Sequence, residues 1–183
     1  MTPFKNGDID ESSLRSLIDW HISEGTHGIV PVGTTGESPT LNHHEHQQVV
    51  EITINQVNKR VPVIAGAGSN STSEAISLLN HAEDAGADAA LVVTPYYNKP
   101  TQEGLYAHFK AINDASNGIP VIIYNIPPRS IVDMSIEVMA KLSKLNNIIG
   151  VKDATSDLSR VEKQKTECDE GFLQFSGEAV SYT

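Results

Sequence analysis

The sequence predicts an α/β fold in which a parallel sheet curves into a barrel. Six short apolar runs recur roughly every 25 to 33 residues, and a segment with helical spacing separates each run from the next. No glycine-rich nucleotide fingerprint follows the first run, and unusual polar residues follow many runs instead of gathering at one point. An open doubly wound sheet shares the alternation of strands and helices. The missing fingerprint and the spread of the polar residues favour the barrel instead, although only six of its usual eight strands are found.

The expected helices carry apolar side chains three or four residues apart, which places them on one helical face. Start and stop signals support several of them. Gly25 and Gly86 can end helices, and Ser71 and Glu74 stand at the spacing of a capping box that would begin one. In chain order the expected helices cover residues 10–24, 42–58, 71–86, 101–116, 135–145 and 158–167.

The expected strands are short runs of valine, isoleucine, leucine and alanine, bounded by glycine, proline or asparagine. In chain order they cover residues 28–32, 61–68, 89–94, 120–125, 148–151 and 172–177. Because consecutive apolar residues are typical of strands buried on both faces, these runs fit a parallel sheet covered by helices. None approaches the roughly 20 residues needed to cross a bilayer.

Composition and charge limit the classes of partner. Thirteen basic and 23 acidic side chains leave a formal net charge of -10, which argues against a nucleic-acid or anionic-membrane surface. The single cysteine, Cys168, excludes an internal disulfide and fits a reducing compartment. The first residues show neither the basic nor the apolar region of a signal peptide, so a cytoplasmic protein is expected.

A lysine follows the fifth apolar run. Lys152 comes directly after residues 148–151, so its amine is expected to be partly desolvated. Desolvation penalises the ammonium form and lowers the pKa, which makes the amine a nucleophile for a carbonyl substrate. The alternative is that Lys152 merely points its ammonium group to water, as most lysines do.

In a barrel, the loops that follow the strands gather at one face. That face would bring together an amine, tyrosine and threonine hydroxyls that can pass protons, and an arginine that can hold carboxylates. The residues concerned are Gly33, Thr34, Thr35, Gly36, Glu37, Tyr96, Tyr97, Tyr124, Asn125, Arg129 and Lys152. Taken singly, the threonines could satisfy loop backbone groups, the tyrosines could be packing aromatics, and the arginine could be a surface cation.

Two other clusters give weaker signals. His43, His44 and His46 suggest a metal site, but no carboxylate or fourth ligand stands at a characteristic spacing, so no metal is expected. Residues 66–71 resemble a dinucleotide-binding loop but lack its third glycine, and a strand-to-helix turn is expected there.

Four motifs occur in a specific order along the chain. They are Gly33-Thr34-Thr35-Gly36-Glu37, Thr94-Pro95-Tyr96-Tyr97-Asn98-Lys99-Pro100, Tyr124-Asn125-Ile126-Pro127 with Arg129, and Gly150-Val151-Lys152-Asp153-Ala154-Thr155. Together they resemble the 4-hydroxy-tetrahydrodipicolinate synthase (dihydrodipicolinate synthase) family of class I pyruvate-dependent aldolases. The resemblance runs from Thr2 to about Gly177. It implies a (β/α)8 TIM barrel followed by a small helical region, assembled as a homotetramer of two tight dimers.

The resemblance implies a lyase of lysine and diaminopimelate biosynthesis. Lys152 would form a Schiff base with pyruvate, whose carbanion equivalent would condense with L-aspartate-4-semialdehyde. Cyclisation would then give 4-hydroxy-tetrahydrodipicolinate. Because the iminium itself serves as the electron sink, no metal or organic cofactor is expected.

The resemblance also implies roles for single residues. Tyr124 would relay protons and lie over Lys152. Thr34 would connect Tyr124 to Tyr97, which in this family comes from the neighbouring subunit. Thr34 and Thr35 would hold the pyruvate carboxylate, and Arg129 would bind the carboxylate of the semialdehyde. The substrate-binding set is Thr34, Thr35, Arg129 and Gly177.

A regulatory site is implied as well. Members of the family that are inhibited by L-lysine bind it at the dimer interface, and the matching positions here are Ser38, His43, His46, Asn70, Glu74 and Tyr96. Glu74 can pair with an ammonium group, and amide, hydroxyl and imidazole groups can complete the pocket. An alanine of some members is Pro39 here. The alternative is that the histidines simply lie on a helix surface.

The chain departs from the family at both ends. Complete members are roughly a hundred residues longer. The chain begins at a Thr-Pro pair that normally follows the first strand, and residues 177–183 depart from the usual acidic run after the seventh. Residues 1–183 are therefore expected to form a partial TIM-barrel catalytic domain with about strands two to seven, without the helical C-terminal region. An open barrel exposes strand edges, so a poorly stable, weakly active or inactive chain is expected.

Two other functions remain open at this point. Related Schiff-base aldolases, such as N-acetylneuraminate lyase or a 2-keto-3-deoxy sugar-acid aldolase, share the lysine and tyrosine. The pair Thr34-Thr35 and Arg129 favour the synthase over them. The other alternative is an inactive fragment or regulatory paralogue. The retained Lys152, Tyr124 and Tyr97 argue against it, whereas the short chain argues for it.

Overall fold

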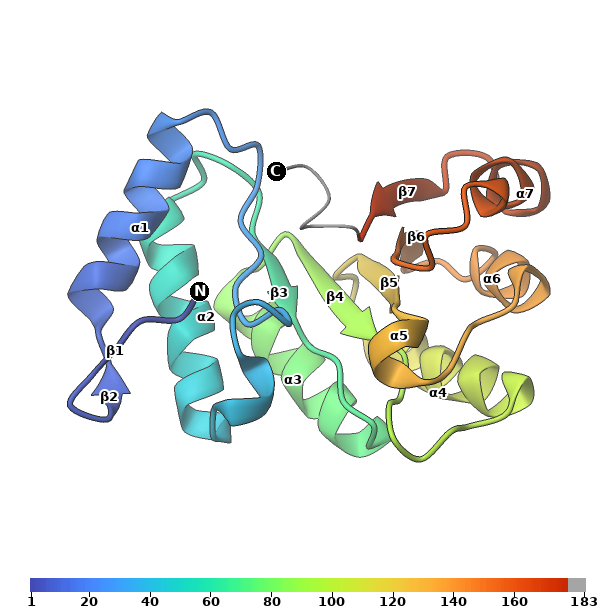
Figure 1. Ribbon diagram of the computed structural model, residues 1–183, viewed down its shortest axis with the longest axis horizontal. Helices are drawn as coiled ribbons and strands as arrows, with labels where there is room; N and C mark the ends of the chain where they lie inside the picture. Colours follow the sequence, from blue (N-terminus) through green and yellow to red (C-terminus); the bar gives the residue numbers. More distant parts are fainter. Residues whose placement is uncertain (178–183) are drawn as a thin grey trace.

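The computed structural model describes residues 1–177, which are built around one parallel sheet (Figure 1). Five strands are neighbours in the order β3-β4-β5-β6-β7. They are β3 (Ile64–Gly66), β4 (Ala89–Val93), β5 (Val121–Asn125), β6 (Ile148–Asp153) and β7 (Leu173–Ser176). Every neighbouring pair is parallel, so the chain must return along the sheet between strands, and helices provide each return.

Helices form an arc around the strands in Figure 1. They are α1 (Glu11–Ser23), α2 (His43–Val57), α3 (Thr72–Ala85), α4 (Gln102–Ala115), α6 (Ile136–Leu142) and α7 (Ser159–Glu167). Every expected helix is present, and only the one expected over residues 135–145 is clearly shorter. Within residues 1–177 the sheet does not close, because β3 and β7 remain its two edges. The prediction of an α/β partial barrel is therefore confirmed.

The first expected strand, over residues 28–32, is not a regular strand. Only Ile29 pairs with the sheet, through a single parallel bridge next to β3. Pro31 has no N–H to give to a ladder, and Val32 has a left-handed φ of 48°. The segment still follows β3, because the N–H of Gly66 donates to the carbonyl of Pro31 at 3.1 Å. The other five expected strands are confirmed, and the one expected over residues 61–68 is shortened to β3.

Three short elements were not expected from the sequence. They are the antiparallel pair β1 (Phe4–Lys5) and β2 (Asp8–Ile9), the 3-10 helix η1 (Ser38–Thr40), and the single-turn helix α5 (Pro127–Ser130). None is long enough to show a hydrophobic period, which explains why sequence patterning missed them.

The capping box expected at Ser71 and Glu74 is wrong. The Ser71 side chain accepts no capping hydrogen bond at the start of α3. The Glu74 carboxylate accepts a hydrogen bond from Ser69 instead of reaching back to the helix start. A complete capping box is found at the start of α2, where Asn42 and Glu45 each accept from the other's backbone N–H.

Two layers of buried side chains lie on the two faces of the sheet. The larger layer packs between strands and helices and includes Val92, Leu105, Phe109, Ile123 and Val151. The smaller layer lies on the inner face and includes Leu91, Ile122, Tyr124, Ile126 and Ala154. Because successive strand residues point to opposite faces, Lys152 shares the inner face with Tyr124.

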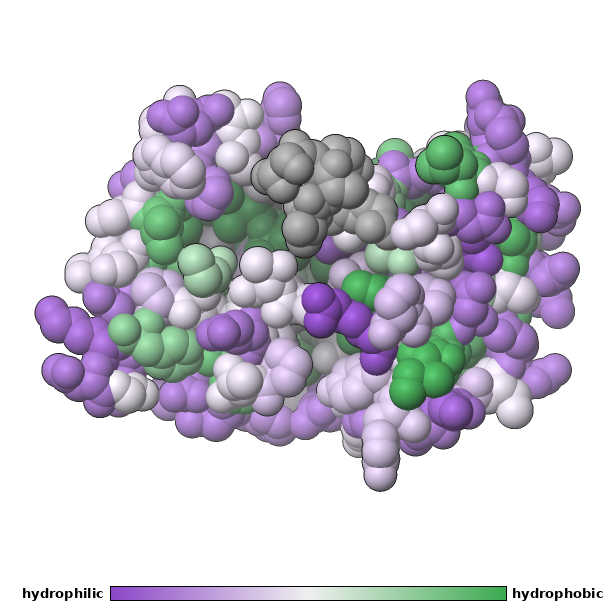
Figure 2. Space-filling model, viewed as in Figure 1, coloured by the Kyte–Doolittle hydropathy of each residue, from purple (hydrophilic) through white to green (hydrophobic). Residues whose placement is uncertain are grey.

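The face of the molecule drawn in Figure 2 has few large apolar areas. Figure 2 shows mostly hydrophilic and neutral residues on one face, with small separated hydrophobic patches. The open edge at β7 exposes Leu173 and Phe175 at 45% and 42%, which leaves strand-edge groups available for pairing. No helix among residues 1–177 has the length and apolar character needed to cross a membrane.

Candidate functional site

Strands β5 and β6 bring Tyr124 and Lys152 together. The two residues are direct partners in the parallel pairing of these strands. The Lys152 Nζ lies 4.3 Å from the centroid of the Tyr124 ring. This is within the range of a cation–π contact when the amine is protonated. The Tyr124 side chain is buried, so the pair lies in a sheltered position on the inner face.

An irregularity in the pairing creates this arrangement. Between the first and second residues of β5, the ladder skips Ile149 on β6. Such an extra residue is a β-bulge, and it shifts every later partner by one position. Without it, Tyr124 would pair with Val151, and Lys152 would point toward the helices because a one-residue shift reverses the face.

The Lys152 side chain is half-buried. Burial lowers the pKa of its ammonium group, because removal from water penalises the charged form. A lowered pKa leaves a larger fraction of free amine near neutral pH, and the free amine is the nucleophile. Lys152 is therefore not an ordinary surface lysine that extends into water.

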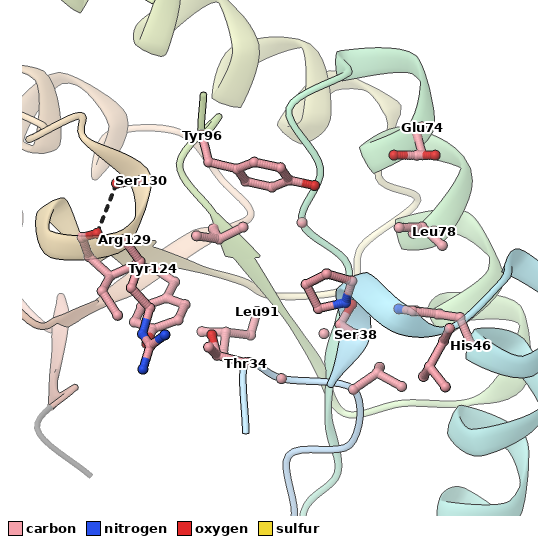
Figure 3. A pocket seen from close by; sticks show the side chains of 18 of the residues that line it. Thr34, Ser38, His46, Glu74, Leu78, Leu91, Tyr96, Tyr124, Arg129 and Ser130 are labelled. Carbon is pink, nitrogen blue, oxygen red and sulfur yellow. Dashed lines mark hydrogen bonds between the residues drawn. The ribbon is translucent and has the colours of Figure 1, made fainter. Parts of the chain in front are cut away.

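A cavity of about 430 Å³ opens beside Tyr124 at the carboxyl ends of the strands (Figure 3). Figure 3 shows Thr34, Tyr124 and Arg129 toward one end, and His46, Leu78 and Glu74 toward the other. Ser38, Leu91 and Tyr96 also line it. One cavity thus contacts residues from both the expected catalytic set and the expected lysine site.

Arg129 reaches this cavity from the short helix α5. Two prolines precede it, and proline is well suited to the first positions of a helix. The buried Ser130 hydroxyl donates to the carbonyl of Ile126 at 2.9 Å and contacts the carbonyl of Val132 at 3.0 Å, which closes the turn. The fixed turn directs a guanidinium toward the same cavity as Tyr124.

Thr34 reaches the cavity from the loop before η1. That loop is compact: the Thr2 hydroxyl donates to the carbonyl of Gly36 at 2.6 Å. A Cβ at Gly36 would lie 3.2 Å from the backbone nitrogens of Val32 and Gly33, so glycine suits this close turn. Because the turn packs on itself, Thr34 is held at the cavity wall.

The opposite end of the cavity carries a carboxylate with neutral and basic neighbours. Glu74 bonds to His43 at 2.7 Å and accepts from Ser69. These bonds, that of Ser69 first, lower the pKa of Glu74 and favour its charged form. His46 is 5% exposed, and neither ring nitrogen has a hydrogen-bond partner among residues 1–177. Burial lowers the pKa of His46 to about 4, so its ring is neutral near pH 7.

Other expected site residues lie outside the cavity wall. Lys152 itself contacts Tyr124, which joins the amine to the cavity. Thr35 is exposed, and Tyr97 is 83% exposed. Asn70 donates to the backbone carbonyl of Tyr96 at 3.3 Å, next to the cavity. Gly177 also lies off the wall; its N–H donates to the carbonyl of Asp153 at 2.7 Å.

Within residues 1–177, no group of three or more histidine, cysteine, aspartate or glutamate side chains is arranged to hold a metal ion. Sequence reasoning missed the apolar walls of the cavity, which include Leu78, Leu91 and Ile126. It also missed a buried polar network behind the strands, around Asn125 and Asp153. The sequence did contain a signal for this network: Asn125 directly follows Tyr124 on β5, and Asp153 directly follows Lys152 on β6.

Comparison with known proteins shows similarity along nearly the whole chain. The model of the dihydrodipicolinate synthetase family matches residues 1–182. The chain is 67% identical over 178 residues to the 4-hydroxy-tetrahydrodipicolinate synthase of Bradyrhizobium diazoefficiens, and this region covers 97% of this chain and 60% of that protein. The chain therefore spans about 60% of the length of the curated relatives it matches.

Solved structures show the same similarity. The chloride-inhibited dihydrodipicolinate synthase from Acinetobacter baumannii complexed with pyruvate has a TM-score of 0.93 and 51% identity, covering 97% of this chain and 61% of that chain. The DHDPS from Cyanidioschyzon merolae with lysine bound has a TM-score of 0.93 and 38% identity, again covering 97% of this chain and 61% of that chain.

Proposed function

Because this chain belongs to the dihydrodipicolinate synthetase family, we propose that it carries the catalytic groups of a lyase of lysine and diaminopimelate biosynthesis. The lyase joins pyruvate to L-aspartate-4-semialdehyde and yields 4-hydroxy-tetrahydrodipicolinate. The supporting observation is the half-buried Lys152 amine against Tyr124, beside a cavity lined by Arg129. This combination supplies a nucleophile, a hydroxyl for proton transfer and a cation for a carboxylate.

The first half of the proposed reaction activates pyruvate. The free amine of Lys152 attacks the keto carbon and forms a C–N bond, and the keto oxygen leaves as water after it is protonated. The resulting iminium withdraws electrons from the neighbouring methyl group. A proton then leaves that methyl group, and the electron pair forms an enamine. The Tyr124 hydroxyl is the nearest assigned group for these proton transfers.

The second half forms the new carbon–carbon bond. The enamine carbon attacks the aldehyde carbon of the semialdehyde, and the aldehyde oxygen takes a proton to become a hydroxyl group. The amino group of the same substrate then attacks the iminium carbon. This attack closes the ring, breaks the C–N bond to Lys152 and releases the amine for another cycle.

The two substrate carboxylates need positioned donors. Arg129 can pair with the semialdehyde carboxylate, since a guanidinium offers two parallel N–H donors. Thr34 and Thr35, from one loop, are assigned to the pyruvate carboxylate. Gly177 is assigned to the substrate-binding set as well. Its backbone lies close to the end of β6, since a Cβ there would lie 2.5 Å from that of Ala154.

A homo-oligomer is part of this proposal. Tyr97 is 83% exposed and has a left-handed φ of 72°. An exposed aromatic residue on a strained turn is a good candidate for insertion into a neighbouring subunit. In a homotetramer of two tight dimers, Tyr97 would complete the hydroxyl series of Thr34 and Tyr124 in the partner.

L-lysine is the proposed inhibitor at the far end of the cavity. Glu74 would pair with its ammonium group, and Ser38, His43, His46 and Tyr96 line the same region. Asn70 borders it through its bond to Tyr96. The solved relative with lysine bound supports this assignment.

The expected cytoplasmic location stays a prediction from the sequence.

Trapping with borohydride tests the proposed nucleophile. The 183-residue chain would be mixed with pyruvate and sodium borohydride, and its peptides would be analysed by mass spectrometry. A reduced pyruvate adduct on the peptide that contains Lys152 is expected. Absence of any adduct would favour an inactive fragment or paralogue. An adduct on a different lysine would contradict the assignment of Lys152.

A second-substrate panel separates the lyases. L-aspartate-4-semialdehyde is expected to discharge the pyruvate adduct before borohydride is added, whereas N-acetylmannosamine and sugar aldehydes are not. Discharge by a sugar alone would support a sugar-acid aldolase instead. The names of the relatives do not favour that alternative.

A further inference from the structure

On the helix side of the sheet, behind Tyr124 and Lys152, lies a polar network that the proposed reaction does not use. Asn125 and Asp153 directly follow these two residues and are also strand partners. Because successive strand residues point to opposite faces, the side chains of Asn125 and Asp153 point away from the inner face and toward the helices.

Arg160, in the first turn of α7, is the centre of this network. Its Nε donates to Asp153 Oδ2 at 3.0 Å, and its Nη2 donates to the carbonyl of Met134 at 2.7 Å. Nη2 also lies 3.4 Å from Asp133 Oδ1. The side chains of Arg160 and Asp153 are only 11% and 14% exposed. The ion pair is therefore largely shielded from water, and removing one partner would leave a poorly solvated charge.

The same network also holds β5 and a second residue of α7. The Asn125 Nδ2 donates to Asp133 Oδ1 at 2.9 Å, and its Oδ1 accepts from the Met134 N–H at 3.0 Å. Gln164, which is 2% exposed, donates to Asp153 Oδ2 at 2.7 Å. The carboxyl ends of β5 and β6 are thus fastened to the segment before α6 and to the first turns of α7.

We propose that Arg160 is a positioning residue, which holds the end of β6 against α7 through Asp153 and thereby keeps the Lys152 amine half-buried against Tyr124. Lys152 and Asp153 share one planar peptide unit, so a displacement of one shifts the other. That Arg160 matters for catalysis rests on the proposed function. That Arg160 keeps the Lys152 amine half-buried does not depend on it.

Charge acts in the same direction as geometry. Tyr124 of β5 and Phe175 of β7 are the strand partners of Lys152 on either side, and Phe175 carries no charge. Asp153 is the adjacent acidic group, and Arg160 holds its carboxylate on the opposite face. Without the guanidinium, the carboxylate would favour the ammonium form of Lys152, and a loosened β6 would let water reach it. Both changes raise the pKa of Lys152.

Competitive labelling with trace acetic anhydride tests this inference on the full 183-residue chain. The acetylation rate of Lys152 across pH, measured by mass spectrometry of its peptide, gives the pKa of that amine without any substrate. Arg160→Met is expected to raise this pKa, and each unit leaves about tenfold less free amine at a fixed lower pH. Arg160→Lys should give an intermediate value, because an ammonium group cannot reproduce the planar set of donors.

Arg60→Met is the matched control. Arg60, in the turn that follows α2, forms a more exposed ion pair with Asp19 of α1 and takes no part in the network around β6. The same substitution there should leave the pKa of Lys152 unchanged. Circular dichroism and urea unfolding of each variant would establish that the labelled chains are folded.

Two further variants keep the test decisive. Gln164→Met removes one donor to Asp153 but leaves the guanidinium in place, so a smaller rise in the pKa of Lys152 is expected even where Arg160→Met is too unstable to measure. The double variant Arg160→Met, Asp153→Asn removes the charge effect but not the loosening. Its Lys152 pKa should therefore stay above that of the parent chain.

An unchanged Lys152 pKa in a folded Arg160→Met chain would overturn the proposal, as would a return to the parent value in the double variant. Failure of the proposed function gives a different result. If the parent chain forms no pyruvate adduct but the pKa changes appear, only the lyase assignment fails. If the adduct forms without pKa changes, only the positioning role fails.

Discussion

The Nζ of Lys152 lies 4.3 Å from the centroid of the Tyr124 ring, across the parallel pair β5 and β6. This contact depends on one skipped residue, Ile149, which shifts the register so that both side chains point to the inner face. The shift places an amine and a phenol together at the edge of a cavity, where an imine could form and exchange protons.

Lys152→Met should abolish borohydride trapping of pyruvate on the chain. The substitution keeps an unbranched side chain of similar length but removes the amine, so no Schiff base can form at this position. Lys144→Met, at an exposed position after α6, is the control and should leave the adduct on Lys152 intact. Mass spectrometry of the two variants checks this. A persistent adduct in Lys152→Met would show that another lysine reacts.

The same substitution should change the pH dependence of stability. Burial lowers the pKa of Lys152 below 10.5, so the unfolded chain binds this proton more tightly than the folded chain. The folded state therefore carries a penalty below the folded pKa, and the penalty disappears as pH rises through that pKa toward 10.5. Relative to the parent, Lys152→Met should gain more free energy of unfolding at pH 7 than at pH 10, as measured with urea.

The buried His46 should make the chain sensitive to acid. Its pKa is lowered from 6.5 to about 4 by burial, so it contributes stability above pH 6.5 that is lost as pH falls toward 4. The loss between pH 7 and 4.5 is about 2 to 3 kcal/mol. His46→Met should be less sensitive to this pH change than the parent chain in urea unfolding.

His44→Met provides the comparison for that prediction. His44 lies on the same helix, α2, but is exposed. It should show the same acid sensitivity as the parent. Equal acid sensitivity in all three chains would mean that His46 does not contribute to the loss of stability in acid.

Arg129→Met should separate the two substrates. Pyruvate adduct formation should be nearly unchanged, because the assigned nucleophile is Lys152. Discharge of the adduct by L-aspartate-4-semialdehyde should need about 10- to 100-fold more semialdehyde, since a charged hydrogen-bonded contact contributes about 1.5 to 3 kcal/mol. The concentration that discharges half of the trapped adduct is the measurement. An equal loss of both steps would argue for a general structural role.

Gly150→Ala should destabilise the sheet. A Cβ at Gly150 would lie 2.5 Å from the carbonyl oxygen of Leu173, on the neighbouring strand β7. The strands would have to separate, at a cost of about 1 to 3 kcal/mol. Gly104→Ala in α4 is the control. Its new Cβ would lie 3.3 Å from the Pro100 Cβ, and alanine is about 1 kcal/mol more favourable than glycine in a helix, so a smaller loss of stability is expected. Urea unfolding of both variants checks the contrast.

Local patterns accounted for most of the secondary structure. Apolar spacing was sufficient for α1, α2, α3, α4 and α6 because each buries apolar side chains of one face, whereas α7 buries only Gln164. Consecutive apolar residues were sufficient for β4, β5 and β6. Patterns failed where a single residue decided the outcome. Pro31 and the left-handed Val32 interrupt the first expected strand. The carboxylate of Glu74 accepts a hydrogen bond from Ser69 instead of capping α3.

The sequence by itself determined the six longer helices, the strands β3 to β7, the family, and the residues proposed for the candidate site, since these follow from local spacing and from motifs. The family resemblance implied that Tyr124 lies over Lys152. Only the tertiary structure decided the strand register that brings the two side chains together and the ion pair of Arg160 with Asp153 behind them. Spacing along a chain shows which residues share a face, but the register between strands depends on the skipped residue in β6 and on contacts between segments distant in sequence.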